Sequence, residues 1–343
     1  MPGSRTVVGG VGSCQNRRVS PGTALQLVER MLEGDRVALA RLMTLVENRA
    51  PELPEVMARI HGRGAPQVIG ITGPPGAGKS TLTDRVTARL RRDGKRVGIV
   101  AVDPSSPFSG GAVLGDRIRM QAHFLDTGVF IRSLASRGSR GGVARATRDV
   151  IRLMAAFGMD AILVETVGVG QTELDVMRLA DTTVVVLVPE AGDAVQVMKA
   201  GLLEIADVFL VNKADREGAE RLHSELLQML QLRPPSAWTV PVLLTQAATD
   251  VGTDQVMEAL AKRQAWLAAD AGRQERERER REQELIDVLD EEVARRVHRN
   301  LAAESADGRA GLIQKVRDGT MDPYTAALTI LGDETAVSRL TRR

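Results

Sequence analysis

The sequence predicts an α/β fold with a mostly parallel sheet flanked by helices, and three observations support this. From about Gln67, short apolar runs alternate with stretches of helical periodicity, which is the pattern of strands joined by crossover helices. The runs are continuously rich in Val, Ile and Leu, as expected for strands buried on both faces. A glycine-rich segment directly follows the first run. The expected strands are residues 68–72, 97–102, 129–134, 161–165, 182–188, 207–212 and 240–245.

Length and composition exclude several classes of protein. The 343 residues suffice for one large domain with appendages. No apolar run approaches the ~20 residues of a membrane helix. The single cysteine, Cys14, excludes a cysteine-based metal site within one chain and favours a reducing, cytoplasmic location. A net charge of +2 and an aromatic content of 2% argue against a nucleic-acid-binding protein.

Three further regions are expected around the α/β domain. The first twenty residues are rich in Gly, Ser and Arg and carry no acid or apolar core of a signal peptide, so we predict a disordered tail. Apolar residues then recur at helical spacing with a break at Gly34 and Asp35, which predicts a helical hairpin. A segment of alternating charges after Trp266 predicts a solvated helix, and a final helix is expected to begin near Pro323. The expected division is 1–20, 21–64, 65–268 and 269–343.

The glycine-rich segment predicts a phosphate site. It matches GxxxxGK[ST] between a strand and a helix, which is the setting of a P-loop. Its glycines let backbone N–H groups surround phosphates, and the helix N-terminus adds a positive dipole. Lys79 is expected near the β- and γ-phosphates, and the Ser80 hydroxyl is a ligand for Mg²⁺. The predicted nucleotide-binding residues here are Gly73, Pro74, Pro75, Gly76, Ala77, Gly78, Lys79, Ser80 and Thr81.

A second motif predicts that the base is guanine. Asn212, Lys213 and Asp215 form NKxD after an expected strand. The Asp215 carboxylate can accept from both N1–H and the 2-amino group of guanine, whereas adenine leaves it unpaired at a cost of about 1–3 kcal/mol or more. The alternative is that Asp215 caps a helix that begins near Arg216. Gln246, Ala247 and Ala248 are expected to contact the base through their backbone, although Gln246 stands where Ser is usual.

Acidic residues at strand ends predict the hydrolysis site. Glu165 occupies the place of the Asp in the DxxG motif of most small GTPases, and Gly168 can approach the γ-phosphate. Asp103 and Asp116 are candidates to hold Mg²⁺ or to position water; Asp116 could instead cap a helix. The basic stretch 137–142 could neutralise phosphate, bind a partner or be a solvated loop.

Seven segments resemble the MeaB/ArgK/MMAA family of methylmalonyl-CoA-mutase-associated GTPases, over roughly residues 25–335. They are GPPGAGKST, AVDPSSPFSGGAVLGDRIRM, SRGSRGG, ETVGVGQ, EAGDAVQVMKAG, NKAD and DPYTAA. The resemblance implies a homodimeric GTPase chaperone that gates cofactor loading and protects or reactivates an adenosylcobalamin-dependent acyl-CoA mutase. It implies a Mg²⁺–phosphate site of Lys79, Ser80, Asp103, Asp116 and Glu165, a third switch with Asp193 and Lys199, and a dimer arm formed by the C-terminal helices.

Two alternatives remain at this point. A nickel or zinc metallochaperone of the same fold would carry Cys and His motifs near the P-loop or the switches, but Cys14 lies outside that core. A P-loop kinase for small molecules would need a phosphoacceptor site and usually lacks NKxD. Co-purification with a cobalamin mutase would discriminate among the three. Methylmalonyl-CoA mutase is the default partner, and isobutyryl- or ethylmalonyl-type mutases stay open.

Overall fold

A computed structural model describes most of the chain in two compact units, which are residues 1–266 and residues 267–343. Each unit is described by itself below. The described residues are 21–103, 123, 125–135, 142–166, 171–189, 201–234, 237–269, 273–306 and 311–341.

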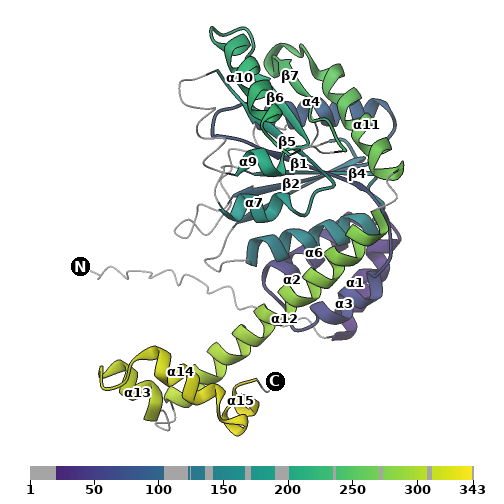
Figure 1. Ribbon diagram of the computed structural model, residues 1–343. Helices are drawn as coiled ribbons and strands as arrows, with labels where there is room; N and C mark the ends of the chain where they lie inside the picture. Colours follow the sequence, from purple (N-terminus) through teal and green to yellow (C-terminus); the bar gives the residue numbers. More distant parts are fainter. Residues whose placement is uncertain are drawn as a thin grey trace, which may run out of the picture. The chain divides into compact units, whose positions relative to one another are not determined.

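The first unit is built on a seven-stranded sheet in which every neighbouring pair is parallel. Its order is β3-β2-β4-β1-β5-β6-β7 (Figure 1). The predicted fold class is therefore confirmed, and each expected strand lies within two residues of its predicted bounds. The strands are β1 Gln67–Thr72, β2 Val97–Asp103, β3 Val129–Ala135, β4 Ala161–Thr166, β5 Thr182–Leu187, β6 Val208–Asn212 and β7 Val242–Thr245.

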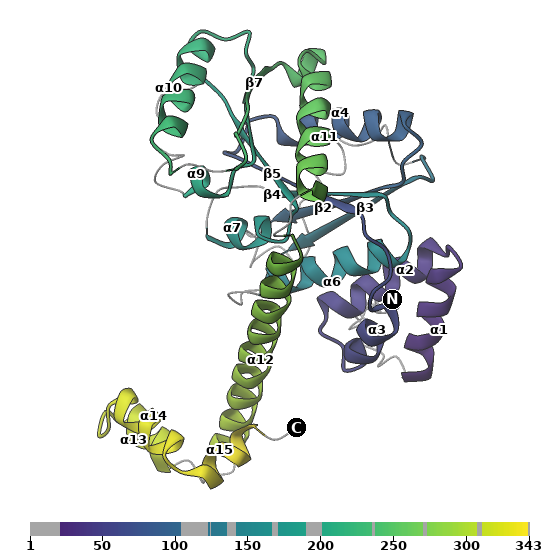
Figure 2. The same cartoon turned by 45° about the vertical axis from the view of Figure 1, so that its right-hand side comes forward.

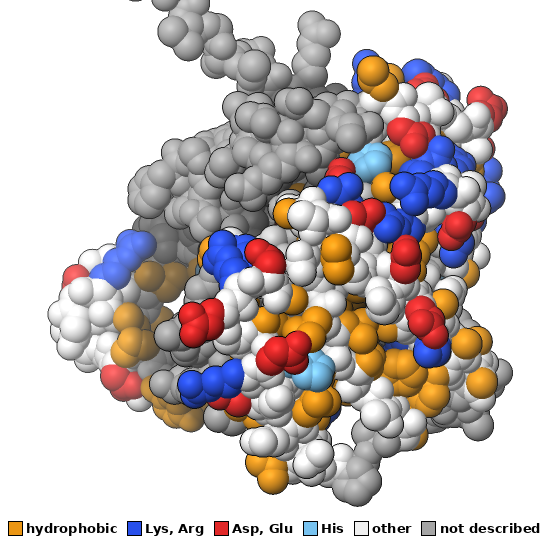
Figure 3. All heavy atoms as spheres, turned by 90° about the horizontal axis from the view of Figure 1, so that it is seen from above, with side chains coloured by type: hydrophobic (Ala, Val, Ile, Leu, Met, Phe, Trp, Pro, Cys, Tyr) orange, Lys and Arg blue, Asp and Glu red, His pale blue; other side chains and the backbone are white. Residues whose placement is uncertain are grey.

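Helices cover both faces of this sheet (Figure 2). Ile69 and Ile71 of β1 belong to a core cluster with Leu82 and Val256 from the helices on one face, while the other faces of the strands pack on the remaining helices. From above, Lys and Arg side chains gather over one part of the surface with Asp and Glu between them (Figure 3). The helices are α4 Lys79–Arg92, α6 Gly142–Ala156, α7 Gln171–Met177, α9 Leu202–Ile205, α10 Ala219–Gln231, η2 Ala247–Thr249 and α11 Thr253–Ala269.

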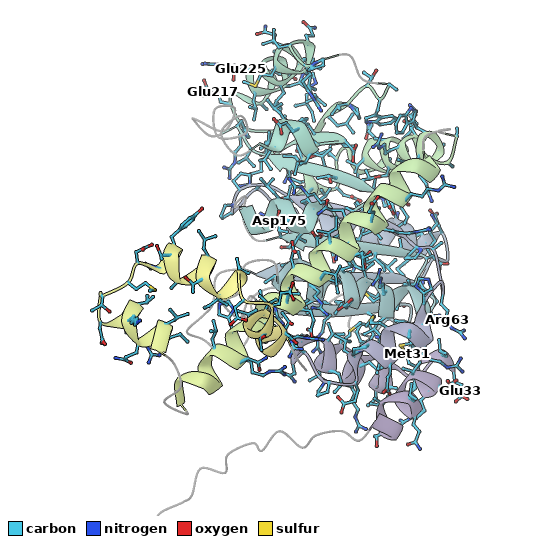
Figure 4. All side chains as sticks on the ribbon, turned by 60° about the horizontal axis from the view of Figure 1, so that its bottom comes forward. Met31, Glu33, Arg63, Asp175, Glu217 and Glu225 are labelled. Carbon is cyan, nitrogen blue, oxygen red and sulfur yellow. The ribbon has the colours of Figure 1, made fainter. Side chains whose placement is uncertain are left out.

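Three N-terminal helices, one more than the predicted hairpin, belong to the same unit: α1 Pro21–Leu32, α2 Arg36–Glu47 and α3 Leu53–Ile60. The predicted break is the start of α2, where the Asp35 carboxylate accepts from the backbone N–H groups of Val37 and Ala38 at 2.8 and 3.1 Å. Met31 is fully buried among these helices (Figure 4). The helices share one core cluster with α6, so they extend the hydrophobic core of the α/β layer.

Three aspartates form hydrogen bonds along the amino-terminal edge of the sheet, a feature that the sequence did not predict. Asp160, Asp181 and Asp207 each precede a strand, and each accepts one backbone N–H at 2.7–3.0 Å from the neighbouring strand or the residue before it. Burial raises the pKa of Asp207, which pairs with Arg263 at 2.7 Å. The Arg263 guanidinium lies 5.0 and 4.4 Å from the ring centroids of the chain's two tryptophans, Trp238 and Trp266. These hydrogen bonds and the ion pair stabilise the amino-terminal edge of the sheet.

The second unit contains α12 Arg273–Ala306, α13 Gly311–Arg317, α14 Pro323–Leu331 and α15 Glu334–Thr341. The helix expected at Pro323 is confirmed, and the Asp322 carboxylate caps it by accepting from the Thr325 N–H at 2.9 Å. It is not the last helix, because α15 follows. Arg296 of α12 donates to the Thr341 carbonyl at 3.1 Å, which ties α12 to the end of α15. Among the described residues, no helix combines the length and apolarity needed to cross a lipid bilayer.

Candidate nucleotide-binding site

The glycines of the P-loop permit backbone geometry that other residues would strain. Gly76 and Gly78 have φ angles of +77° and +93°. Gly73 has φ of +144°, and a Cβ there would lie 2.0 Å from the Val186 carbonyl oxygen of β5. The loop therefore runs directly against the neighbouring strand before it enters α4. Only glycine tolerates both the close approach and the left-handed backbone.

Lys79 is the first residue of α4, and its side chain folds back over the loop. The ammonium donates to the carbonyls of Gly73 and Pro74 at 2.8 and 2.9 Å, and the residue is only 6% exposed. A buried ammonium needs acceptors, and the loop backbone supplies them here. The charge consequently lies within the curve of the predicted phosphate site, where phosphate oxygens would be stronger acceptors than carbonyls.

The structure brings Ser80 and Glu165 together, as the predicted Mg²⁺ site requires. The Ser80 hydroxyl donates to Glu165 Oε1 at 2.5 Å. Thr83 Oγ1 lies 3.0 Å from Glu165 Oε2 and 2.9 Å from the Lys79 carbonyl, so its one proton can serve either acceptor. Sequence reasoning missed Thr83, although its position three residues after Ser80 places both on one helix face. Two hydroxyls of α4 thus hold the carboxylate at the end of β4.

Several predicted residues are not placed by the described part of the chain. Asp103 ends β2, paired in register with Ala135, but its side chain is outside the described part. Asp116, Gly168, Asp193 and Lys199 lie outside the described residues, as do 137–141 of the basic stretch. Their predicted contributions to Mg²⁺, water and the third switch therefore remain predictions.

Asn212 joins the predicted phosphate and base segments. It ends β6, and its Nδ2 donates to the Ala77 carbonyl of the P-loop at 2.7 Å. Its Oδ1 accepts from the Ala247 N–H at 2.9 Å and from the Thr245 hydroxyl at 3.3 Å. A Cβ on Gly78 would lie 2.3 Å from this Nδ2, so the contact also requires glycine there. One buried amide therefore fixes the spacing between three loops.

The helix-capping alternative for Asp215 is wrong. Helix α10 begins at Ala219 and not near Arg216, and Gly218 with φ of +89° is its N-cap. The chain first turns through Lys213 at φ of +56°, and the Ala214 N–H donates to the Thr245 carbonyl at 3.0 Å. Asp215 is exposed at this turn. The Asp215 carboxylate therefore does not cap α10.

The third predicted segment forms a closed turn after β7. Gln246 and Val251 exchange two backbone hydrogen bonds, at 2.9 and 3.1 Å, around the short helix η2. The Gln246 side-chain oxygen lies 3.3 Å from the Thr249 hydroxyl, so the Gln that departs from the usual Ser is accommodated inside the turn. Ala247 is buried and Ala248 is exposed.

Comparisons with known proteins agree with this geometry. Residues 39–302 match the family described as "Methylmalonyl Co-A mutase-associated GTPase MeaB". A protein of Pyrococcus abyssi assigned as a GTPase is 45% identical over 311 residues, covering 89% of this chain and 95% of that protein. GTPase ArgK of Escherichia coli is 32% identical over 320 residues, covering 90% and 95%.

Two further likenesses extend the comparison. The mouse protein named "Methylmalonic aciduria type A homolog, mitochondrial" is 35% identical over 264 residues, covering 71% of this chain and 64% of that protein. A crystal structure titled as a LAO/AO transport system kinase has a TM-score of 0.64 and 27% identity, covering 91% of this chain and 97% of the other. The extent of the family match, together with the P-loop and NKxD geometry, shows that this chain belongs to the MeaB family of P-loop GTPases.

Proposed function

We propose that this GTPase is a chaperone for an adenosylcobalamin-dependent acyl-CoA mutase, with methylmalonyl-CoA mutase as the first candidate. It gates cofactor loading and protects or reactivates the mutase, and GTP hydrolysis drives the change between its states. The family description and the name of the mouse relative support this partner. They favour it over the nickel or zinc metallochaperone and the small-molecule kinase that a P-loop alone would permit.

The observation that carries the nucleotide-binding part of the proposal is the linkage of phosphate and base segments through Asn212. Its amide binds the P-loop at Ala77 and the turn at Ala247, so the two halves of a guanine-nucleotide site form one assembly. In this assignment the P-loop backbone and Lys79 bind the phosphates, and Asp215 reads the base. Movement of a nucleotide-sensitive loop would then be transmitted to the other loops at the carboxyl edge of the sheet.

The residues at the phosphate end fit Mg²⁺. Ser80 and Glu165 present a hydroxyl and a carboxylate side by side, and hard oxygen ligands of this kind suit that ion. Asp103 and Asp116 are the further candidates for the metal or for the attacking water. When bound, Mg²⁺ would neutralise charge on the β- and γ-phosphates. Thr83 orients Glu165, and Lys79 supplies the remaining positive charge to the phosphates.

Binding to the mutase should depend on the nucleotide. We expect the full chain loaded with a non-hydrolysable GTP analogue to form a complex with purified methylmalonyl-CoA mutase on gel filtration, because Asp193 and Lys199 of the third switch would transmit the nucleotide state. The Lys79→Ala chain, which should not retain nucleotide, is the control and should behave alike with and without the analogue. A chain that binds none of the methylmalonyl-, isobutyryl- or ethylmalonyl-type mutases in any nucleotide state would remove the mutase from the account.

The second unit supports a homodimer. Leu285, Leu289 and Val293 of α12 are 59%, 53% and 45% exposed, and their spacing of four residues places them in one apolar stripe along the helix. Apolar stripes of this kind are normally buried against another surface. A second copy of the chain is the proposed partner for this stripe.

Charges in the stripe should therefore produce monomers. We expect the double variant Leu285→Glu, Leu289→Glu to elute and scatter light as a monomer while it still binds GDP, because the nucleotide residues lie in the first unit. The matched control is Leu232→Glu, since Leu232 is 86% exposed in the first unit. A double variant that stays dimeric would place the interface elsewhere.

A further inference from the structure

Two arginines of the P-loop helix hold the turn formed by residues 246–251. Arg85 donates from Nε to the Ala247 carbonyl at 3.1 Å and from Nη2 to the Ala248 carbonyl at 3.0 Å. Arg89 donates to the Asp250 carboxylate at 2.7 Å and from Nε to Asp254 at 3.1 Å. The two arginines are four residues apart, so they extend from one face of α4. One face of the helix therefore carries four polar contacts to this turn and to the start of α11.

The turn that they hold is strained. Asp250 has φ of +64°, a left-handed conformation that residues other than glycine rarely adopt. Its carboxylate accepts from Arg89 and also from the Thr253 hydroxyl at 2.8 Å. Gly252 follows at φ of +85°, where a Cβ would lie 2.6 Å from the Leu244 carbonyl oxygen. A strained turn persists only when its surroundings restrain it, and the arginines provide such restraints.

The restrained turn presents a backbone donor at the predicted base side. The Ala247 N–H is taken by Asn212, whereas within the described residues the Ala248 N–H has no hydrogen-bond acceptor. The carbonyls of both alanines are directed to Arg85. An oxygen atom of a nucleotide base is the kind of acceptor that would pair with this N–H. Guanine carries such an oxygen at position 6, and adenine carries an amino group there.

We infer that Arg85 and Arg89 are positioning residues that set selectivity for the 6-oxo group of guanine. The inference rests on the proposed assignment of residues 246–248 to the base side of the nucleotide site. Helix α4 begins with the phosphate-side residues Lys79 and Ser80, and Arg85 and Arg89 bind the turn about two and three helical turns later. The helix thus fixes the distance between the phosphate and base ends of the site. Groups that are already held at the right spacing bind a ligand more tightly than mobile groups.

A third arginine on the helix offers a matched control. Arg91 likewise donates two side-chain hydrogen bonds, at 2.7 and 2.9 Å, but both go to the carboxylate of Asp126 before β3. Within the described residues, its side chain donates to Asp126 and to the Lys95 carbonyl and not to the 246–251 turn. Replacing Arg91 therefore removes an ion pair of the same kind from the same helix without touching the proposed base side.

The test compares GDP with 2-aminopurine riboside 5′-diphosphate, which keeps the 2-amino group but lacks the 6-oxo group and, with it, the N1–H. The contact of Asp215 with N1–H is therefore lost for the analogue in every variant alike, and only a change in the ratio between variants reports on the 6-oxo group. Dissociation constants of the full chain for both are measured by competition with a fluorescent GDP. We expect wild type and Arg91→Ala to prefer GDP by the same ratio. The double variant Arg85→Ala, Arg89→Ala should lose ~10-fold or more of that ratio, because one hydrogen bond to the base is no longer aligned. Affinity for the analogue should change far less.

A second variant guards against simple loss of structure. Asp250→Asn removes the charge that Arg89 binds, while asparagine tolerates a left-handed backbone, and thermal melts show whether each variant is folded. We expect this variant to lower the GDP preference by a smaller factor than the arginine pair. Folded variants that weaken both nucleotides equally, or that keep the wild-type ratio, overturn the inference. If wild type itself does not prefer GDP to the analogue, the proposed assignment of Asp215 and of the turn to the base side fails instead.

Discussion

Replacing Lys79 by alanine is expected to abolish tight nucleotide binding. The ammonium now lies between the carbonyls of Gly73 and Pro74, at the centre of the P-loop. Hydrogen bonds from a charged donor contribute about 1.5–3 kcal/mol each, and every 1.4 kcal/mol is a factor of about ten in affinity. GDP carries the β-phosphate but not the γ-phosphate, so loss of the charged contact to the β-phosphate should weaken GDP binding by ~10- to 100-fold. Isothermal titration of the full chain with GDP and Mg²⁺ measures this directly.

The same substitution should also lower the melting temperature of the nucleotide-free protein. Lys79 is only 6% exposed. Alanine at this position leaves the carbonyls of Gly73 and Pro74 without the donor that they have in wild type. Lys79→Gln separates the two effects, because its amide can still donate to a loop carbonyl but carries no charge for phosphate. We expect the glutamine variant to melt closer to wild type and still to bind GDP poorly. Wild-type GDP affinity in either folded variant would remove Lys79 from the phosphate site.

Asp215→Asn is expected to switch the preferred nucleotide from GTP to xanthosine triphosphate. The Asp carboxylate can accept from N1–H and from the 2-amino group of guanine. The Asn amide keeps one acceptor but turns an NH₂ donor toward that amino group, whereas xanthine has a carbonyl there. Each mismatched polar contact costs about 1–3 kcal/mol, so the combined change in preference should be several kcal/mol. Competition binding of the two nucleotides to wild type and variant measures it.

The fold should survive this change, because Gly218 and not Asp215 starts α10. A suitable control is Glu217→Gln, which removes a nearby exposed carboxylate; Glu217 lies just before α10 (Figure 4). We expect the control to keep the wild-type preference and both variants to melt like wild type. An Asp215→Asn protein that still favours GTP by the wild-type margin would mean that Asp215 does not read the base.

Strands and motifs were predictable because their signals are local. Val-, Ile- and Leu-rich runs indicate buried parallel strands, and the P-loop and NKxD follow directly after such runs. The Ser80–Glu165 contact could be anticipated from the same logic, since carboxyl ends of parallel strands share one edge. The seven strands were therefore confirmed to within two residues.

The features that were missed depend on contacts distant in sequence. Thr83 approaches Glu165 across 82 residues, and Arg85 reaches Ala247 across 162 residues, so no local pattern marks them. The start of α10 was misplaced because Lys213 adopts a left-handed conformation, which lengthens the turn before the helix. The third N-terminal helix, α3, spans only eight residues. Helices that short give few repeats of the apolar period from which to recognise them.

The most direct test of the central claim is the rate of GTP hydrolysis with and without the mutase. Phosphate release by the full chain is measured with Mg²⁺ alone and then with purified adenosylcobalamin-dependent methylmalonyl-CoA mutase. We predict slow hydrolysis by the chain alone and clear acceleration by the partner, since supplying missing charge to a GTPase site raises its rate by roughly 10³–10⁵ in well-studied cases. Equal rates with and without every candidate mutase would contradict the proposal that this GTPase is coupled to a cobalamin enzyme.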